Sequence, residues 1–370
     1  MLATRHGSSM HSDLSKKKEF DALHGLRGVA ALIVVLYHYQ QSRPGTSVVF
    51  SSGYLAVDLF FVLSGFVIGY VYEHRLETTL SLLRFVEIRL IRLYPLYFLG
   101  CLITLSGVAI HIARTHELWV MKAYLRALLP AIVILPKIDE TSGRWFVLNP
   151  PAWSLFYELV FNFLYARFLP VLTSRRVAVG VFSSLIVLLG YSWYFGALDQ
   201  GSSSWVLGPF RATYGLGLGV LLFRAWERRV LITIKLPLVI PPLIFLIIGT
   251  FPSNGAVAAP LITLSLVCLI PLTTVTAIKQ ETLSGPIRSA MLFLGNLSYP
   301  IYALHWPIME ICRGLLWHRI DDVRIVDVIT FFATMLASWL AVKLYDRPVR
   351  NWISKQLKIR RSLVAVAPAL

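Results

Sequence analysis

The stretch LHGLRGVAALIVVLYHY, residues 23–39, decides the fold that we expect for this chain. It is apolar over almost its whole length, which is typical of a membrane-spanning helix, yet it carries Arg27 and His38. The two side chains are eleven residues apart. At about 100° per residue this is nearly three turns, so they share one helix face, about 16 Å apart along the axis. Because a guanidinium and an imidazole are costly in lipid, we expect both to face a protein interior or a wet cavity.

The composition of the 370-residue chain indicates an all-α, polytopic membrane protein. Hydrophobic residues make up 56% of the chain and charged residues 15%, and the mean hydropathy is +0.68. A soluble domain rarely tolerates that balance. Apolar stretches of about twenty residues recur along the chain, so we expect about ten transmembrane helices. We place them at residues 24–41, 54–73, 93–113, 152–172, 177–195, 206–224, 232–251, 256–278, 290–313 and 323–345.

The positive charges set the expected topology. The net charge is +16, and with the N-terminus inside most of the 35 Lys and Arg residues fall in cytoplasmic segments. Both termini are therefore expected in the cytoplasm. We see no soluble basic domain, and so expect no nucleic-acid partner. The apolar segment 118–136 is interrupted by Lys122 and Arg126. We expect it to be a re-entrant or interfacial amphipathic helix at the outer side, because a full crossing would reverse every later loop.

Three regions follow from this reading. Residues 1–21 are expected to be a disordered basic cytoplasmic tail, residues 22–346 the transmembrane domain, and residues 347–370 a second basic cytoplasmic tail. The lipid bilayer is the first partner that the sequence implies.

A set of ionisable side chains from five expected helices is predicted to lie at one depth, in the outer half of the membrane. The set is His38, Asp58, Glu158, Arg211 and His305. Trp153 precedes Glu158 in the fourth expected helix and joins the candidates. Simpler structural roles stay open for several of them: an interfacial position for Asp58, a hydrogen-bonding role for Glu158, and packing beside a proline kink for His305.

The opposite side has a basic cluster of Arg84, Arg89 and Arg92 ahead of the third expected span. Arg89 and Arg92 are three residues apart and share a helix face. Two interpretations remain. The arginines could anchor the topology, or they could bind a phosphorylated cytoplasmic ligand, because guanidinium groups match phosphate geometry. Arg27 would extend such a site inwards.

These residues predict a path through the membrane with a phosphate-attracting cytoplasmic mouth and a histidine-bearing outer chamber. A histidine that is neutral near pH 7 suits general-base work on a hydroxyl. It could equally relay protons in a transporter or polysaccharide exporter, although we find no internal repeat of the kind such folds carry. The residues alone leave that choice open. No metal-binding spacing occurs, and we expect no metal.

The chain resembles the acyltransferase 3 family of bacterial integral-membrane O-acyltransferases, at five motifs in the family's order. Residues 23–38 are similar to LDGLRGIAALxVVxxH, residues 57–66 to VDxFFVLSGF, residues 89–95 to RxxRxxP, residues 153–158 to WSLxxE, and residues 294–307 to LGxxSYxxYLxHxP. One departure is His24, which stands where the family usually has aspartate or another polar residue.

The resemblance implies an enzyme of the bacterial inner membrane that needs no permanently bound cofactor. It would take an acyl group, in our expectation acetyl, from cytoplasmic acyl-CoA. The acceptor would be a hydroxyl of an envelope glycan, an exopolysaccharide or a lipid-linked sugar. The enzyme would act alone or with a separate envelope-biosynthesis protein as partner. His38 would carry the family's essential histidine. The expected catalytic set is His38, Arg27, Asp58 and Glu158; the donor-binding set is Arg84, Arg89 and Arg92; further candidates are His305, Arg211 and Trp153.

Overall fold

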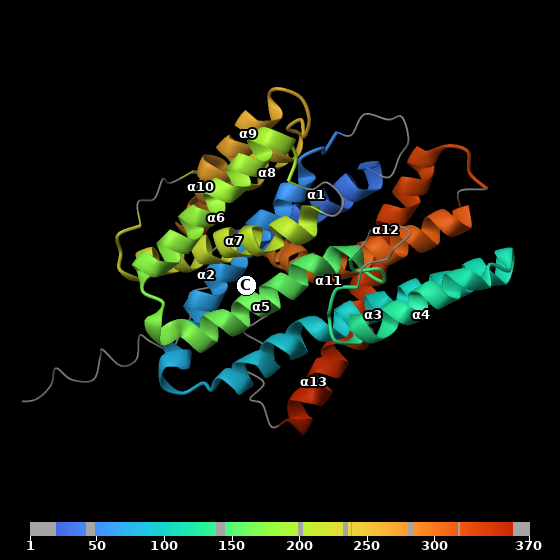
Figure 1. Ribbon diagram of the computed structural model, residues 1–370, viewed down its shortest axis with the longest axis horizontal. Coiled ribbons are helices and arrows are strands. Elements are labelled where there is room, and N and C mark those ends of the chain that lie inside the picture. Colours follow the sequence, from blue (N-terminus) through green and yellow to red (C-terminus); the bar gives the residue numbers. More distant parts are fainter. Residues whose placement is uncertain are drawn as a thin grey trace, which may run out of the picture.

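The computed structural model describes residues 20–41, 49–137, 145–198, 203–231, 236–237, 239–279, 284–316 and 319–357. These residues form a bundle of helices (Figure 1). Within them the only extended pairing is a single bridge between Lys137 and Phe146. The all-α expectation is thus confirmed for the described chain. The expected N-terminal tail, up to residue 19, lies outside the described residues.

The helices have the following bounds: α1 Asp21–Gln41, α2 Ala56–Thr78, α3 Leu82–Thr115, α4 Leu118–Ile132, α5 Trp153–Phe168, α6 Ser174–Phe195, α7 Ser203–Glu227, α8 Ile240–Gly249, α9 Ala258–Leu264, α10 Ile270–Lys279, α11 Gly285–Leu316, α12 Val323–Ala341 and α13 Arg347–Gln356. Two π-helical turns join neighbouring helices without a break: η5, Ser265–Leu269, between α9 and α10, and η6, Val342–Asp346, between α12 and α13. Residues 347–356 of the expected C-terminal tail are therefore helical, and residues 358–370 lie outside the described chain.

Seven of the described helical segments are long and apolar enough to cross a membrane. They correspond to α1, α2, α3, α6, α7, the α9–α10 segment and the α12–α13 segment. Helix α5 has 16 residues and α8 has 10, which is short for an independent span. The protein is therefore a multi-pass membrane protein, and the count of ten crossings remains a prediction.

Glycines bring the central helices into close contact. A Cβ atom on Gly65 of α2 would lie 2.0 Å from the backbone oxygen of Leu216 on α7. A Cβ on Gly28 of α1 would lie 2.4 Å from the Cβ of Leu294 on α11. In a bilayer, small residues at helix contacts let backbones approach and gain dispersion contacts. The pairs α2–α7 and α1–α11 accordingly form the tightly packed centre of the bundle.

The helix ends show which helices run in the same direction. At one end of the bundle Asp21 of α1 pairs with Arg288 of α11 at 3.1 Å. At the other end Arg313 of α11 donates to the Tyr39 carbonyl of α1 at 2.8 Å. Helices α1 and α11 are therefore parallel. The first turn of α3 lies beside the end of α13, because Arg84 donates to the Leu357 carbonyl at 3.0 Å.

Helix α4 turns back along α3, and the two lie side by side in Figure 1. Tyr97, near the middle of α3, donates its hydroxyl to the carbonyl of Ala131 near the end of α4 at 2.8 Å. The 15 residues of α4 span only about 22 Å, less than the thickness of the hydrocarbon core. Helix α5 then begins inside the bundle, where Ser154 contacts the middle of α11 through Tyr302 at 2.7 Å. The placement of residues 118–136 as a re-entrant or interfacial segment stays a prediction.

Candidate functional site

Four helices meet at a buried cluster of charged side chains. Arg89 of α3 is 1% exposed and donates to the Glu158 carboxylate of α5. Ser64 of α2 donates to the same carboxylate oxygen at 2.7 Å. Arg92 follows Arg89 on the same face of α3, and Arg27 comes from α1. Arg89 and Arg92 share a helix face as expected, since α3 begins at Leu82 and carries both arginines inside it.

The cluster has more positive charge and more hydrogen-bond donors than its own carboxylate can satisfy. Three guanidinium groups, those of Arg27, Arg89 and Arg92, lie around the Glu158 carboxylate. A second carboxylate, that of Asp346, lies within electrostatic range of Arg92. Nη1 of Arg27 and both Nε and Nη1 of Arg89 are buried and donate to no acceptor within the described part of the chain. Buried donors of this kind are costly when they stay unsatisfied. The cluster is chemically suited to an anionic ligand with several acceptor oxygens.

Two cavities adjoin at this cluster. The inner cavity, of about 70 Å³, is lined among others by Ser64, Glu158 and Tyr302. The vestibule, of about 220 Å³, lies between α3, α11 and the α12–α13 segment. Arg27, Arg92 and Tyr299 line both cavities. A ligand in the vestibule would therefore reach the inner cavity past two guanidinium groups.

His38 lies next to a second histidine. Its ring stacks on that of His305, with centroids 5.2 Å apart and planes 23° apart. The indole of Trp306 meets the His38 ring edge-on at 5.2 Å. Nδ1 of His305 lies 2.8 Å from the Tyr302 carbonyl, and because a carbonyl oxygen can only accept, Nδ1 is the donor. The site therefore holds two imidazoles in contact.

A single aromatic side chain connects the inner cavity to the histidine pair. Tyr302 lines the inner cavity, and its ring centroid is 5.9 Å from that of His305. Its hydroxyl is held by Ser154 at 2.7 Å and by the Pro151 carbonyl at 2.9 Å. The tyrosine is therefore fixed between the cluster and the histidines.

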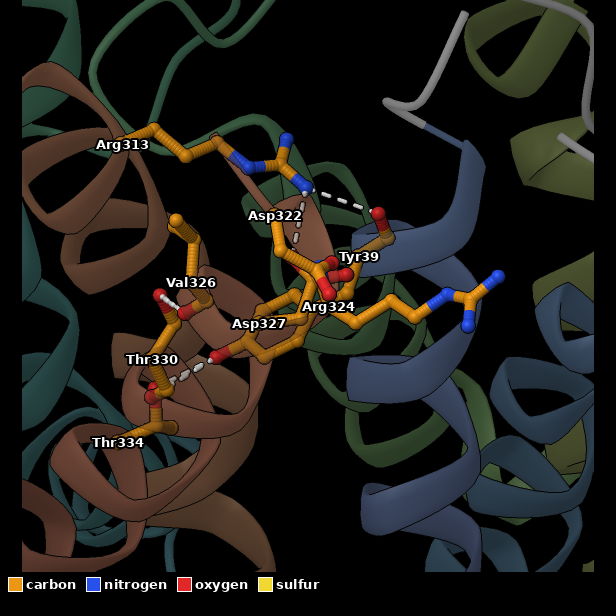
Figure 2. Close-up of polar contacts among 8 residues, drawn as sticks. All are labelled: Tyr39, Arg313, Asp322, Arg324, Val326, Asp327, Thr330 and Thr334. Atoms are coloured by element: carbon orange, nitrogen blue, oxygen red, sulfur yellow. Dashed lines mark hydrogen bonds and ion pairs between the residues drawn. The ribbon is translucent and has the colours of Figure 1, made fainter. Parts of the chain in front are cut away.

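The end of α1 that carries His38 is anchored by the neighbouring residue, Tyr39. Figure 2 shows the Tyr39 carbonyl accepting from Arg313 and the Tyr39 hydroxyl against Thr334 of α12. The hydroxyl–hydroxyl distance to Thr334 is 2.7 Å. Arg313 also approaches the Asp327 carboxylate at 3.6 Å. Helices α1, α11 and α12 are thus joined one residue beyond His38.

Asp58 lies apart from the inner cavity. Its carboxylate accepts two bonds from Arg211 of α7, at 2.7 and 3.0 Å, and both side chains are fully buried. Arg211 also donates to the Tyr54 carbonyl at 3.0 Å and lies over the Trp153 ring at 5.0 Å. We expected Asp58 and Glu158 in one chamber. The structure instead gives each carboxylate its own arginine on a different side of α2.

The five ionisable groups expected in one outer chamber therefore fall into three separate sets of contacts, and their common depth in the membrane stays a prediction. Glu158 belongs with the arginine cluster, because α5 begins inside the bundle and carries Glu158 towards Arg89. His38 and His305 form a second group, and Asp58 with Arg211 a third. Arg84 stands outside all three. It is about one-third exposed and pairs with Glu87 at 2.7 Å.

Several cavity residues were not singled out from the sequence: Ser64, Ser154, Asn296, Tyr299 and Tyr302. All five lie inside the motifs that suggested the family resemblance, so that signal could have found them. No group of three His, Cys, Asp or Glu side chains suited to a metal ion occurs in the described part of the chain.

Comparison with known proteins places the chain in a family. The sequence model of the acyltransferase 3 family, described as an acyltransferase domain, matches residues 20–343. The chain belongs to this family, and it is an O-acyltransferase. No solved structure matches it.

Three curated relatives illustrate the range of the family. Protein 2 in the picA locus of Rhizobium radiobacter is 37% identical over 187 residues, which is 47% of this chain and 95% of the relative. The exopolysaccharide production protein ExoZ of Rhizobium meliloti is 25% identical, over 69% of this chain and 76% of ExoZ. The O-acetyltransferase OatA of Staphylococcus aureus is 23% identical over 89% of this chain, and the chain spans 57% of OatA.

Proposed function

We propose that this protein moves an acyl group, in the first instance acetyl, from cytoplasmic acyl-CoA to a hydroxyl of an envelope glycan, exopolysaccharide or lipid-linked sugar, in the bacterial inner membrane. The observation that carries the proposal is the buried arginine cluster. It has guanidinium donors without acceptors, it opens into two cavities, and it shares α1 with His38. A phosphorylated donor supplies the acceptor oxygens that these donors lack.

In the proposed reaction the acceptor hydroxyl oxygen attacks the thioester carbonyl carbon. A carbon–oxygen bond forms, the carbon–sulfur bond breaks, and the products are an ester and coenzyme A. The His38 imidazole takes the hydroxyl proton and returns it to the leaving thiolate, so that the histidine is regenerated. His305 packs flat on His38 and orients it.

We assign the arginines different roles within the donor site. Arg27 and Arg92 line both cavities, so in this proposal they bind the diphosphate of the donor. Arg89 is held by Glu158 and positions that carboxylate and its neighbour Ser64. Arg84 is partly exposed and engaged with Glu87 on the surface, and it has no part in the donor site in this scheme.

The nature of the acceptor rests on the relatives. ExoZ carries the name of an exopolysaccharide production protein and OatA that of an O-acetyltransferase. The first name supports a polysaccharide as the acceptor, and the second supports an oxygen atom as the atom that is acylated. The name O-acetyltransferase supports acetyl as the group that is transferred.

The decisive experiment measures acetyl transfer from radiolabelled acetyl-CoA in membrane vesicles that contain the protein and an envelope-glycan fraction. We expect His38→Ala and His38→Gln to be inserted normally and to lose transfer, because neither side chain can take the proton. His111→Ala is the matched control, since His111 is half-exposed on α3, and it should keep full activity. Full transfer by either His38 variant would refute the base assignment. Solute movement that consumes no donor would favour the transporter alternative.

A further inference from the structure

The vestibule contains a second group of arginines that the proposed reaction does not use. Arg347 and Arg350 line it together with Asp346 and Asn296. None of these four residues lines the inner cavity, so they lie on the side of the vestibule away from Glu158. The vestibule thus has arginines at two places: Arg27 and Arg92 at its junction with the inner cavity, and Arg347 and Arg350 beyond it.

This second group is built by the π-helical turn η6. The turn ends at Asp346, and α13 begins at Arg347 without a break in the helix. π-helical turns inside α-helices are frequent at functional sites, because the extra residue changes which side chains face inwards. In this chain the turn puts a buried carboxylate at the vestibule wall, immediately before the exposed Arg347.

Asp346 gives the vestibule a second feature that suits a ligand. Its residue is 2% exposed, and Oδ2 accepts from Arg350 at 2.7 Å. Oδ1 is buried and accepts no hydrogen bond from the described chain. A buried carboxylate oxygen without a donor is costly, so a ligand that donates a hydrogen bond here would remove that cost. The same contact holds the Arg350 guanidinium against the vestibule.

We infer that Arg347, Arg350 and Asp346 form a binding subsite for a phosphate on a hydroxyl-bearing sugar, separate from the diphosphate position at Arg27 and Arg92. The arginines match the phosphate oxygens, and the free Asp346 oxygen matches a neighbouring hydroxyl or amine. If the donor is acyl-CoA, as proposed above, the group that fits is the phosphorylated ribose of its nucleotide end, with its phosphate at one place and the diphosphate at the other.

The test compares coenzyme A with 3′-dephospho-coenzyme A, which lacks only the ribose phosphate. Binding to the purified full-length protein in nanodiscs is measured by thermal stabilisation and by equilibrium dialysis. We expect the wild type to bind coenzyme A at least about tenfold more tightly, the contribution of one or two charge-assisted contacts. Arg347→Gln and Arg350→Gln should each remove most of that preference and leave the affinity for the dephospho form unchanged.

Two controls keep the outcome clear. Lys355→Gln removes a positive charge from the same helix at an exposed position that does not line the vestibule, and it should keep the preference. Arg350 is the arginine that donates to Asp346, whereas Arg347 acts on Asp346 only through its charge. Its variant therefore tests the subsite even if Arg350→Gln disturbs the position of Asp346.

The possible results distinguish failure of the subsite from failure of the donor proposal and from binding of a lipid headgroup. Equal wild-type affinity for both ligands, or a preference that survives both arginine variants, would overturn the subsite and leave the proposed transferase intact. Binding of neither ligand would instead refute the donor proposal, and the subsite with it. If phosphatidylglycerol in the nanodisc competes with coenzyme A in the wild type but not in Arg350→Gln, the phosphate belongs to a lipid headgroup, and the nucleotide assignment fails.

Discussion

Replacing Asp58 by leucine should destabilise the protein strongly, because it leaves the Arg211 guanidinium buried beside a neutral side chain. The two groups are fully buried and joined by bonds of 2.7 and 3.0 Å. At 2.7 Å the attraction is about 6 kcal/mol for an effective dielectric constant of about 20. Part of that attraction offsets desolvation, so we expect a loss of about 3–5 kcal/mol of unfolding free energy, the range measured when one partner of a buried pair is removed.

The double variant Asp58→Leu/Arg211→Leu distinguishes the loss of the ion-pair attraction from the cost of burying a charged group. Replacing both charged groups by apolar ones removes the desolvation cost together with the attraction, so the double variant should be more stable than Asp58→Leu alone by at least about 2 kcal/mol. Unfolding free energies are measured by titrating the protein in mixed micelles with sodium dodecyl sulfate and following tryptophan fluorescence. Glu87→Gln, which breaks the partly exposed pair with Arg84, should cost less than about 1 kcal/mol.

This prediction also tests the role of Asp58. If Asp58→Leu costs less than about 1 kcal/mol, or the double variant is no more stable than the single one, the argument from the buried ion pair is wrong. An Asp58→Asn variant that folds normally and loses acetyl transfer would restore Asp58 to the catalytic set predicted from the sequence.

Three further predictions concern packing, the His38 helix and topology. Gly65→Ala should destabilise by about 1–3 kcal/mol, because its Cβ would lie 2.0 Å from the α7 backbone; Gly190→Ala, which meets nothing within 4 Å, should be neutral or slightly stabilising in the same denaturation assay. Arg313→Gln should lower kcat while leaving the donor KM unchanged, because it weakens the anchor on the Tyr39 carbonyl beside His38 without touching the donor cavities; an unchanged kcat would contradict this. A cysteine introduced at Asn254 should react with an impermeant thiol reagent from outside and one at Gln356 should not, in a background without native cysteines; the reverse pattern would contradict cytoplasmic termini.

Local sequence signals were sufficient for the parts of this protein that depend on helical periodicity. The apolar run in α1 and the eleven-residue spacing of Arg27 and His38 need only one continuous helix, and α1 is continuous from Asp21 to Gln41. Likewise Arg89 and Arg92 share a face because both lie inside α3. The order of the five motifs indicated the family, which the match over residues 20–343 confirms.

The contacts of Glu158 could not be obtained in the same way. A span of ordinary length starts at the membrane surface, and such a start predicts Glu158 in the outer chamber near His38. Helix α4 instead packs back along α3 as far as Tyr97, and the chain then enters α5 from within the bundle. Glu158 therefore meets Arg89, whereas the His38 ring stacks on His305.

The sequence by itself determined the helical membrane fold, the family and which polar side chains share a helix, because these depend on composition and on the geometry of a single helix. Only the tertiary structure decided which charge pairs with which and where the cavities lie. Those outcomes depend on how far each helix is rotated and inserted relative to its neighbours. Close contacts such as Gly65 on Leu216 fix that rotation between α2 and α7, and with it the pairing of Asp58 with Arg211.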